Sequence, residues 1–376
     1  MLDGAAHDET LLSIEELEVR GFRNLATQRV RLHARFNVLS GDNGQGKTNA
    51  LEAIYLAATS HSFRTTSLGE CVQHGCDSAL ACVRVGDPRD LGAPPREQRV
   101  EIVEGRRRVR LDGKRPPTLA AYALATPVVL FDPSSLTLTQ GGARERRKLL
   151  DRVALHIAAR AGGGEALLRD QDRYREALLR RRRALERGIS AAILAPYEHI
   201  LSEHGARIVA ARASAAAALR APCIEAFRSI ALTREPLAID YAPRAPADPE
   251  AFARALEERR ETDARRGTAT VGPHLDDLSL ALGDRPVRQV ASQGQHRALV
   301  LALKSAELST IATARDVRPV LLLDDVSSEL DRTRNAAFFD FLRAQVGQVV
   351  LTTTRPDLVP LASDRLDLRV CGGLVE

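Results

Sequence analysis

The segment Gly41–Thr48, which reads Gly-Asp-Asn-Gly-Gln-Gly-Lys-Thr, constrains the fold more than any other part of the chain. It follows a short apolar run, Phe36–Leu39, and opens a helical-looking stretch, Asn49–Ala58. A strand, a glycine-rich loop and a helix in this order form the context of a phosphate-binding loop. Glycines let the backbone turn its N–H groups toward phosphate oxygens, and the helix N-terminus adds a partial positive charge there. The segment therefore predicts a nucleotide site.

Two side chains of this loop have tasks of their own. Lys47 can reach the β- and γ-phosphates of a nucleoside triphosphate, and the Thr48 hydroxyl can hold Mg²⁺. We therefore expect ATP and Mg²⁺ as cofactors. The residues predicted to bind them are Gly41, Asp42, Asn43, Gly44, Gln45, Gly46, Lys47 and Thr48. The alternative is a glycine-rich loop that only turns a strand into a helix.

The composition is that of an ordinary soluble protein, with 44% hydrophobic and 27% charged residues in 376. No apolar run approaches the roughly 18 residues that suggest a membrane span, and the acidic segment Met1–Thr10 lacks the apolar core of a signal peptide. The 5 cysteines are scattered without a CxxC pair, which favours reduced thiols over a disulfide framework or a metal site. We therefore expect a cytoplasmic protein. The net charge of +5 is compatible with a polyanionic partner but is weak support by itself.

The hydrophobic pattern divides the chain into three parts. Short alternating or apolar runs typical of strands fill residues 1–140 and return in residues 268–376. Residues 141–267 are dominated by alanine, leucine, arginine and glutamate, and their apolar residues recur at helical spacing. The predicted fold class is α/β: a mixed sheet around the phosphate loop, formed by the two outer parts, and an inserted, mainly helical second domain.

Polar residues follow directly after buried strands in the predicted sheet. Asp324 and Asp325 come after one strand and Thr352–Thr354 after another, and ligands of such sheets bind at the carboxyl ends of the strands. One site can therefore collect them with the phosphate loop. Near-continuous apolar runs predict three central strands covered on both faces: Phe36–Leu39, Val320–Leu323 and Val349–Leu351.

The predicted catalytic residues are Lys47, Asp324 and Asp325. Asp324 can hold Mg²⁺ through water while Thr48 binds the ion directly. Asp325 points the other way along the strand and can orient the attacking water. The alternative is a pair of acids that only solvate the end of a strand.

A second anion site is predicted at Ser292-Gln-Gly-Gln295, where a serine and a glycine precede a helix. We expect Ser292 and Gly294 of one subunit to contact the nucleotide held by the Lys47 loop of another, which predicts an ATP-dependent homodimer. The alternative is an ordinary helix N-cap by Ser292.

Together these segments carry a family resemblance. Gly41–Thr48, Ser292–Gln295 and Leu321–Asp331 resemble the Walker A, signature and Walker B/D-loop segments of an ABC-type ATPase. More narrowly, the chain resembles the RecF family of bacterial recombination and gap-repair proteins over nearly its whole length. The stretches that carry this narrower resemblance, in the expected order, are Phe22–Leu25, Ser62–Thr65, Gly272–Leu278, Ala291–Gln295 and Val350–Thr354.

The resemblance implies an ABC-type ATPase head that binds ATP and DNA, dimerises on ATP and hydrolyses it slowly. It further implies a cytoplasmic protein, without a membrane, that acts in gap repair and replication restart and helps load recombinase through RecR and RecO. The DNA is expected to be duplex or gapped and bound through its backbone. By the same resemblance, Ser328 and Asp331 form the D-loop, a threonine of 352–354 replaces the usual switch histidine, and Arg64 lies near nucleotide or DNA.

The chain departs from the family pattern at three places. Leu275 stands where an arginine is expected, His296 stands where a glutamine is expected, and Asp132–Leu136 is a loosened segment. We expect His296 to be an exposed helix residue. The run Arg180–Arg183 is predicted either to contact DNA phosphates or to form a solvated face.

Two other classes of protein share some of these motifs. The ATPase subunit of a membrane transporter keeps its phosphate loop and its strand-end acid much closer together. A long-armed chromosome-organising ATPase needs far more heptads and a CxxC zinc hook. Both are ranked below an ATP-gated DNA-binding protein.

Overall fold

The computed structural model describes residues 11–376 except 88, 90–91, 188–190, 232–234, 326–331, 346 and 362–363. The chain forms two compact units. Unit 1 comprises the described residues of Met1–Ser135, Ser229–Ala231 and Glu307–Glu376, and unit 2 those of Leu136–Arg228 and Leu232–Ala306. The predicted domain limits at residues 140 and 267 remain predictions.

A six-stranded sheet in unit 1 has the order β14-β13-β3-β12-β11-β7. Its members are β3 (Phe36–Ser40), β7 (Val128–Phe131), β11 (Val320–Asp324), β12 (Val349–Thr353), β13 (Arg365–Cys371) and β14 (Leu374–Val375). Neighbours from β7 to β13 are parallel, and β14 is antiparallel to β13. The three strands predicted to be central, β3, β12 and β11, are adjacent, and β11 and β12 are buried throughout. Their apolar runs therefore reflect burial on both faces.

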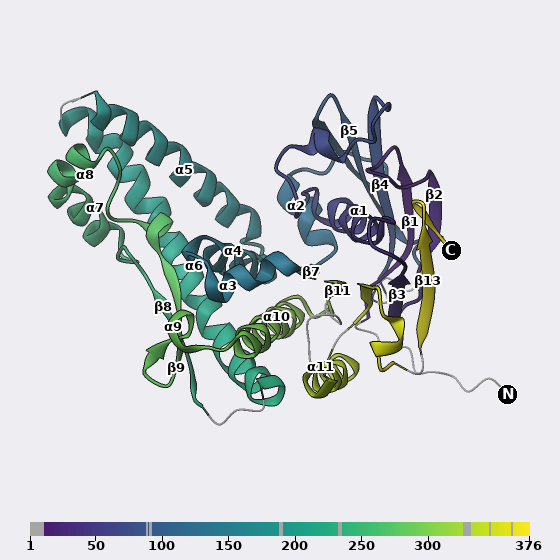
Figure 1. The fold of residues 1–376 in the computed structure, drawn as a ribbon. Helices are drawn as coiled ribbons and strands as arrows, with labels where there is room; N and C mark the ends of the chain where they lie inside the picture. The colour runs from purple at the N-terminus through teal and green to yellow at the C-terminus, as the bar shows by residue number, and fades with distance from the viewer. Residues whose placement is uncertain are drawn as a thin grey trace. The chain divides into compact units, whose positions relative to one another are not determined.

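A five-stranded antiparallel sheet, also in unit 1, has the order β2-β1-β4-β5-β6. Its strands are β1 (Ser13–Arg20), β2 (Gln28–Arg31), β4 (Ser78–Gly86), β5 (Arg96–Val103) and β6 (Arg106–Leu111). Helix α1 (Lys47–Thr59) packs against β4 and β5 and also against β11 and β12 of the other sheet (Figure 1). Its alanines, buried almost completely, let both sheets approach the helix that follows the phosphate loop. This unit also contains α2 (Leu119–Ala125), α11 (Arg332–Gln345) and the last part of α10 (Gln293–Arg315).

Unit 2 is mainly helical, as the composition of residues 141–267 predicted. Its helices are α3 (Thr137–Gln140), α4 (Ala143–Arg160), α5 (Gly164–Glu186), α6 (Ala191–Ala231), α7 (Pro249–Glu258), α8 (Arg260–Arg266), α9 (Val287–Val290) and the first part of α10 (Gln293–Arg315). They accompany a three-stranded antiparallel sheet formed by β8 (Leu237–Ala242), β9 (Asp277–Leu282) and β10 (Arg285–Pro286).

Short sequence patterns in unit 2 indicate the start of one helix correctly and the type of one other element wrongly. The Asp248 carboxylate accepts a hydrogen bond from the Ala251 N–H and caps α7, and Pro249 at the first position of the helix favours the same start. Val287–Val290 looks strand-like in the sequence but forms the single helical turn α9. Its two valines stand three residues apart, which suits a helical turn, and four residues are too few to separate the two periods.

The arginine run of α5 does not form one face. Arg181 is 1% exposed and pairs with the buried carboxylates of Asp263 (2.7 Å) and Glu198 (3.1 Å). Arg180 and Arg182 are exposed and form ion pairs one helical turn away, with Glu176 and Glu186. Arg181 thereby ties α5 to α6 and α8, and its neighbours lie on the solvated surface.

Among the described residues, every helix is too short or too polar to cross a bilayer.

Candidate functional site

The phosphate loop adopts backbone conformations that two of its glycines make possible. Gly41 has a φ of 150°, and a Cβ there would overlap with the Val370 carbonyl oxygen of β13. Gly46 has a φ of 116°, and a Cβ there would lie 3.0 Å from Asn24 Oδ1. Any larger residue would displace the loop at both points. Glycine is therefore required at both positions by the path of the backbone.

Four carbonyl groups of the loop accept hydrogen bonds. The Lys47 ammonium donates to the carbonyls of Gly41 (2.7 Å) and Asp42 (2.8 Å). Asn24 Nδ2 donates to the Gly44 carbonyl at 3.1 Å, and the Gly373 N–H donates to the Gln45 carbonyl at 3.0 Å. Since the two ends of a peptide group point in opposite directions, these bonds fix the direction of the loop N–H groups.

The strand-end acid and the loop hydroxyl meet directly. Thr48 Oγ1 donates to Asp324 Oδ1 at 2.9 Å, and Thr352 Oγ1 donates to the same oxygen at 2.7 Å. Thr352 Oγ1 in turn accepts the N–H of Asp325 at 3.0 Å. A hydroxyl and a carboxylate within hydrogen-bond distance are oxygen donors that suit Mg²⁺. The predicted convergence of the phosphate loop, Asp324 and a threonine of 352–354 is present.

Burial changes the acid–base properties of both charged groups. Burial raises the pKa of Asp324, against the hydrogen bonds from Thr352 and Thr48 that favour the carboxylate. Burial also lowers the pKa of Lys47, against the attraction of Asp325, Asp324 and Asp42. Each charged form is thus short of compensating solvation. A phosphate group beside Lys47 and a cation beside Asp324 would supply it.

A third acid near this edge was not assigned to the site from the sequence. Asp132 follows β7, which pairs with β11, and its negative charge contributes to the raised pKa of Asp324. Its carboxylate accepts hydrogen bonds from Ser134 and Ser135 in the segment that departs from the family pattern. An apolar strand followed by an acid was a usable signal here, since the same pattern identified Asp324.

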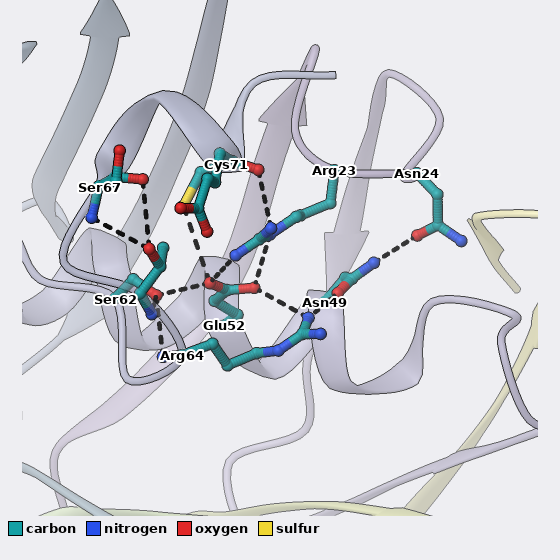
Figure 2. Close-up of polar contacts among 10 residues, drawn as sticks. Arg23, Asn24, Asn49, Glu52, Ser62, Arg64, Ser67 and Cys71 are labelled. Atoms are coloured by element: carbon teal, nitrogen blue, oxygen red, sulfur yellow. Dashed lines mark hydrogen bonds and ion pairs between the residues drawn. The ribbon is translucent and has the colours of Figure 1, made fainter. Parts of the chain in front are cut away.

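Beside the phosphate loop lies a buried carboxylate, Glu52 of α1, shown in Figure 2. Arg23 binds it with two hydrogen bonds of 2.8 and 3.0 Å, Ser62 donates at 2.6 Å, and Arg64 lies 3.3 Å away. Burial alone would raise the pKa of Glu52, but the hydrogen bonds from Arg23 and Ser62 keep the pKa below its ordinary value. Glu52 thus stays ionised and holds the Ser62–Thr65 loop against α1.

A chain of polar contacts joins this cluster to the phosphate loop (Figure 2). Arg64 Nη1 donates to Asn49 Oδ1 at 2.6 Å, and Asn49 Nδ2 donates to Asn24 Oδ1 at 2.6 Å. Asn24 is the residue that holds the Gly44 carbonyl. The Arg64 side chain is 44% exposed, so one side of its guanidinium is open to solvent. The expected location of Arg64 near nucleotide or DNA remains a prediction.

Ser292 belongs to unit 2 and is exposed at the start of α10. Its hydroxyl accepts the Gln295 N–H at 3.2 Å, and its own N–H donates to Gln295 Oε1 at 2.8 Å. This reciprocal pair is a capping box, so Ser292 does act as an N-cap. Gly294 lies in the first turn of the same helix. The contact with a second subunit's nucleotide stays a prediction, and Ser328 and Asp331 lie outside the described residues.

The departures from the family pattern have separate outcomes. Leu275 is 40% exposed, in a short turn whose neighbours form a buried polar cluster. In that cluster Asp276 accepts hydrogen bonds from Arg212 and Tyr241. His296 was predicted to be exposed, and this is wrong: it is 5% exposed, and burial lowers its pKa.

Comparisons with known proteins identify the family. The model for the RecF/RecN/SMC N terminal domain matches residues 13–370. The DNA replication and repair protein RecF of Myxococcus xanthus (strain DK1622) is 40% identical over 373 residues, which cover 96% of this chain and 96% of the relative. RecF of Anaeromyxobacter sp. (strain Fw109-5) is also 40% identical, over 97% of this chain and 99% of the relative.

Solved structures extend this likeness to three dimensions. A structure of the recombination mediator protein RecF with ATP superposes with a TM-score of 0.84 at 26% identity and covers 99% of both chains. An Smc head bound to the C-winged helix domain of ScpA superposes with a TM-score of 0.58 at 15% identity over 96% of both chains, which shows the fold alone. The predicted fold class, an ABC-type ATPase head with a mixed sheet, is confirmed. In its motifs, its fold and its relatives over nearly its whole length, the chain belongs to the RecF family.

Proposed function

We propose that this chain is a cytoplasmic, ATP-dependent DNA-binding protein of gap repair and replication restart, with a weak ATPase activity that acts as a switch. ATP closes two copies into a dimer that holds DNA and assists recombinase loading with RecO and RecR. The observation that carries this proposal is the hydrogen bond between Thr48 and Asp324 at the mouth of the phosphate loop. The curated relatives, which are DNA replication and repair proteins, support the cellular role.

In the proposed reaction, Lys47 moves its ammonium from the Gly41 and Asp42 carbonyls onto the β- and γ-phosphate oxygens. Thr48 and Asp324 would hold Mg²⁺, which when bound neutralises charge on those phosphates. Asp325, held at its backbone by Thr352, orients a water in line with the γ-phosphate. Thr352 keeps Asp324 aimed at the loop. The roles of Lys47, Asp324 and Asp325 as catalytic residues are part of this proposal.

Dimerisation is tested at the exposed N-terminus of α10. Ser292→Arg is expected to keep nucleotide affinity within about twofold of wild type and to leave the protein monomeric with ATP, because a large cation replaces a group that meets the second subunit. Sedimentation velocity with and without ATP measures the dimer. Ser214→Arg, at an exposed position of α6 in the same unit, is the control and should dimerise normally. Parallel losses of nucleotide affinity and dimer in Ser292→Arg would contradict a contact made in trans.

The arginine-rich edge strand β6 is the surface that we assign to DNA. Arg106, Arg108 and Arg110 are exposed along it, and Arg107, Arg108, Arg110 and Arg115 line a cleft of about 500 Å³. Guanidinium groups pair well with phosphate oxygens, so we expect the arginines of this cleft to contact the DNA backbone. The alternative to DNA binding is a structural role for the same arginines, because charged side chains on an edge strand prevent it from pairing with other sheets.

Replacing Arg106, Arg108 and Arg110 by alanine is expected to weaken binding of duplex DNA in the presence of ATP. The slope of log affinity against log salt should become shallower by about 2 to 3, since each phosphate contact contributes about 0.9. Fluorescence anisotropy across a salt series measures this. The control removes the same charge from exposed arginines elsewhere, Arg254, Arg265 and Arg266. Equal changes in both triple variants would mean that binding follows net charge and not β6.

A further inference from the structure

The turn between β13 and β14 lies against the middle of the phosphate loop. The residues in contact, Gln45 of the loop and Gly372 of the turn, are 327 residues apart in the sequence. The Gly372 N–H donates to Gln45 Oε1 at 2.7 Å, and the Gly373 N–H donates to the Gln45 carbonyl at 3.0 Å. The side-chain and main-chain oxygens of Gln45 therefore accept hydrogen bonds from two consecutive N–H groups of one turn. Both segments belong to unit 1.

The turn is itself fixed from the other side. The Gly373 carbonyl accepts the Ala26 N–H at 3.0 Å and Gln28 Nε2 at 2.7 Å, and Gln28 Oε1 accepts the Val375 N–H at 2.9 Å. The Gly373 N–H thus donates to the phosphate loop, while the Gly373 carbonyl is held by Ala26 and by Gln28, the first residue of β2. A displacement of this residue would be transmitted to Gln45.

The packing between these segments is backbone against backbone. Gly373 is buried with a φ of 85°, and a Cβ there would overlap with the Asn24 carbonyl oxygen. Gly372 in the same turn also has a positive φ, of 55°, but a Cβ there would meet nothing within 4 Å. The two glycines share a left-handed conformation and differ in whether a methyl group fits. This difference permits a matched test.

A phosphate loop works only if its N–H groups face the ligand, so its carbonyls must be turned away and satisfied elsewhere. The Gly44 carbonyl is held by Asn24, and the Gln45 carbonyl by Gly373. Without the second bond, the peptide that joins Gln45 to Gly46 could rotate, and its N–H would lose its direction. Preorganised N–H groups bind phosphate without the cost of ordering the loop at each binding event.

We propose that the β13–β14 turn is a positioning element of the nucleotide site. Its main-chain N–H groups hold Gln45 so that the loop N–H groups face the phosphates, and the close packing of Gly373 fixes the place of the turn. Gln45 and Gly373 are positioning residues, since they act through the orientation of the loop. The inference rests on the proposed function, because it concerns the affinity of the same loop for ATP.

The test compares Gly373→Ala with Gly372→Ala in the full-length protein. Binding of the fluorescent nucleotide mant-ATP with Mg²⁺ is measured well below the melting temperature of each variant, and melting is followed by circular dichroism without nucleotide. Gly373→Ala is expected to bind mant-ATP about tenfold or more weakly, because small misplacements of positioning groups carry effects of this size or larger. Gly372→Ala should bind within about threefold of wild type, although both variants melt earlier from the strain of alanine at positive φ.

A third variant keeps the test decisive if Gly373→Ala does not fold. Gln45→Leu removes only the side-chain acceptor of the Gly372 N–H, from a half-buried position. It should bind mant-ATP several-fold more weakly while melting close to wild type, a separation that a purely structural role would not produce.

The outcomes separate this inference from the proposed function. Wild-type protein that binds no mant-ATP would overturn both. Wild-type binding that Gln45→Leu and a folded Gly373→Ala retain in full would overturn the inference alone. A loss of affinity in Gly372→Ala as large as that in Gly373→Ala would also overturn it, because strain and not position would then be the cause.

Discussion

Arg181→Met is expected to lower the free energy of unfolding by about 3 to 5 kcal/mol, the range typical of removing one partner from a buried ion pair. The Arg181 side chain is 1% exposed, and its guanidinium lies between Asp263 and Glu198, whose carboxylates are buried as well. Methionine fills much of the volume but leaves Asp263 without the charge that faces it. A urea titration followed by far-ultraviolet circular dichroism reports on the helices of unit 2 and measures the loss.

Arg180→Met is the matched control for this variant. Arg180 is the preceding residue of α5, is exposed, and pairs with Glu176 one turn earlier. Its replacement should change the unfolding free energy by less than about 0.5 kcal/mol, because exposed ion pairs within a helix contribute little. A small effect of Arg181→Met, similar to that of Arg180→Met, would mean that the buried cluster does not hold α5, α6 and α8 together.

The contrast between these neighbours shows what a sequence pattern can and cannot reveal. A run of arginines on a helix indicates that some of them face solvent, since successive residues point in different directions. Which one turns inward depends on partners 17 and 82 residues away, Glu198 and Asp263. Those distant acids leave no local signal. The same limit explains His296, whose burial depends on what packs over the first turns of α10.

The phosphate loop and its strand-end acids were predictable because their signals are local. An apolar strand, a glycine loop and a helix follow one another in the chain, and the apolar character of β11 and β12 follows directly from burial on both faces. Parallel strands bring their carboxyl ends to one edge, so the sequence alone was enough to place Asp324 and Thr352 together.

The partner of β3 on its other side was not predictable in this way. β13 alternates polar and apolar residues. It pairs with β3, which lies more than 300 residues earlier in the sequence. Nothing in the alternation of Arg365–Cys371 indicates that the turn after it touches Gln45. The signal that remains is the pair Gly372-Gly373, which predicts a tight turn but not its neighbour.

Asp324→Asn is expected to reduce ATP hydrolysis by about 10- to 100-fold, the effect typical of removing a group that supports a bound metal from the second layer. The amide oxygen can still accept from Thr48 and Thr352, so the fold of the site should be kept. The variant loses the negative charge that would balance Mg²⁺. A steady-state phosphate-release assay at saturating ATP and Mg²⁺ measures the loss. Asp357→Asn, an exposed change in the same unit, should hydrolyse ATP like wild type.

The same variant should be more stable than wild type when nucleotide is absent. Burial raises the pKa of Asp324 in the folded state, so the folded protein binds a proton at this group more readily than the unfolded chain does. The stability that this proton provides is present below the unfolded pKa and is lost as pH rises through the folded pKa. The amide of the variant does not titrate in this range. The melting temperature of Asp324→Asn minus that of wild type should therefore grow as pH rises from about 4 to about 7.

Mg²⁺ and ATP should reverse this order, because a ligand stabilises the folded state in proportion to its affinity. Wild type, with the ionised carboxylate at residue 324, should gain more in melting temperature from Mg²⁺ and ATP than the variant does. A pH-independent difference between the two proteins, or an equal gain from Mg²⁺ and ATP, would contradict the assignment of Asp324 to the metal. Asp324 would then be a structural residue that is held in place by its hydrogen bonds from Thr48 and Thr352. The loss of stability that its buried charge causes would not be offset by a role in ATP hydrolysis.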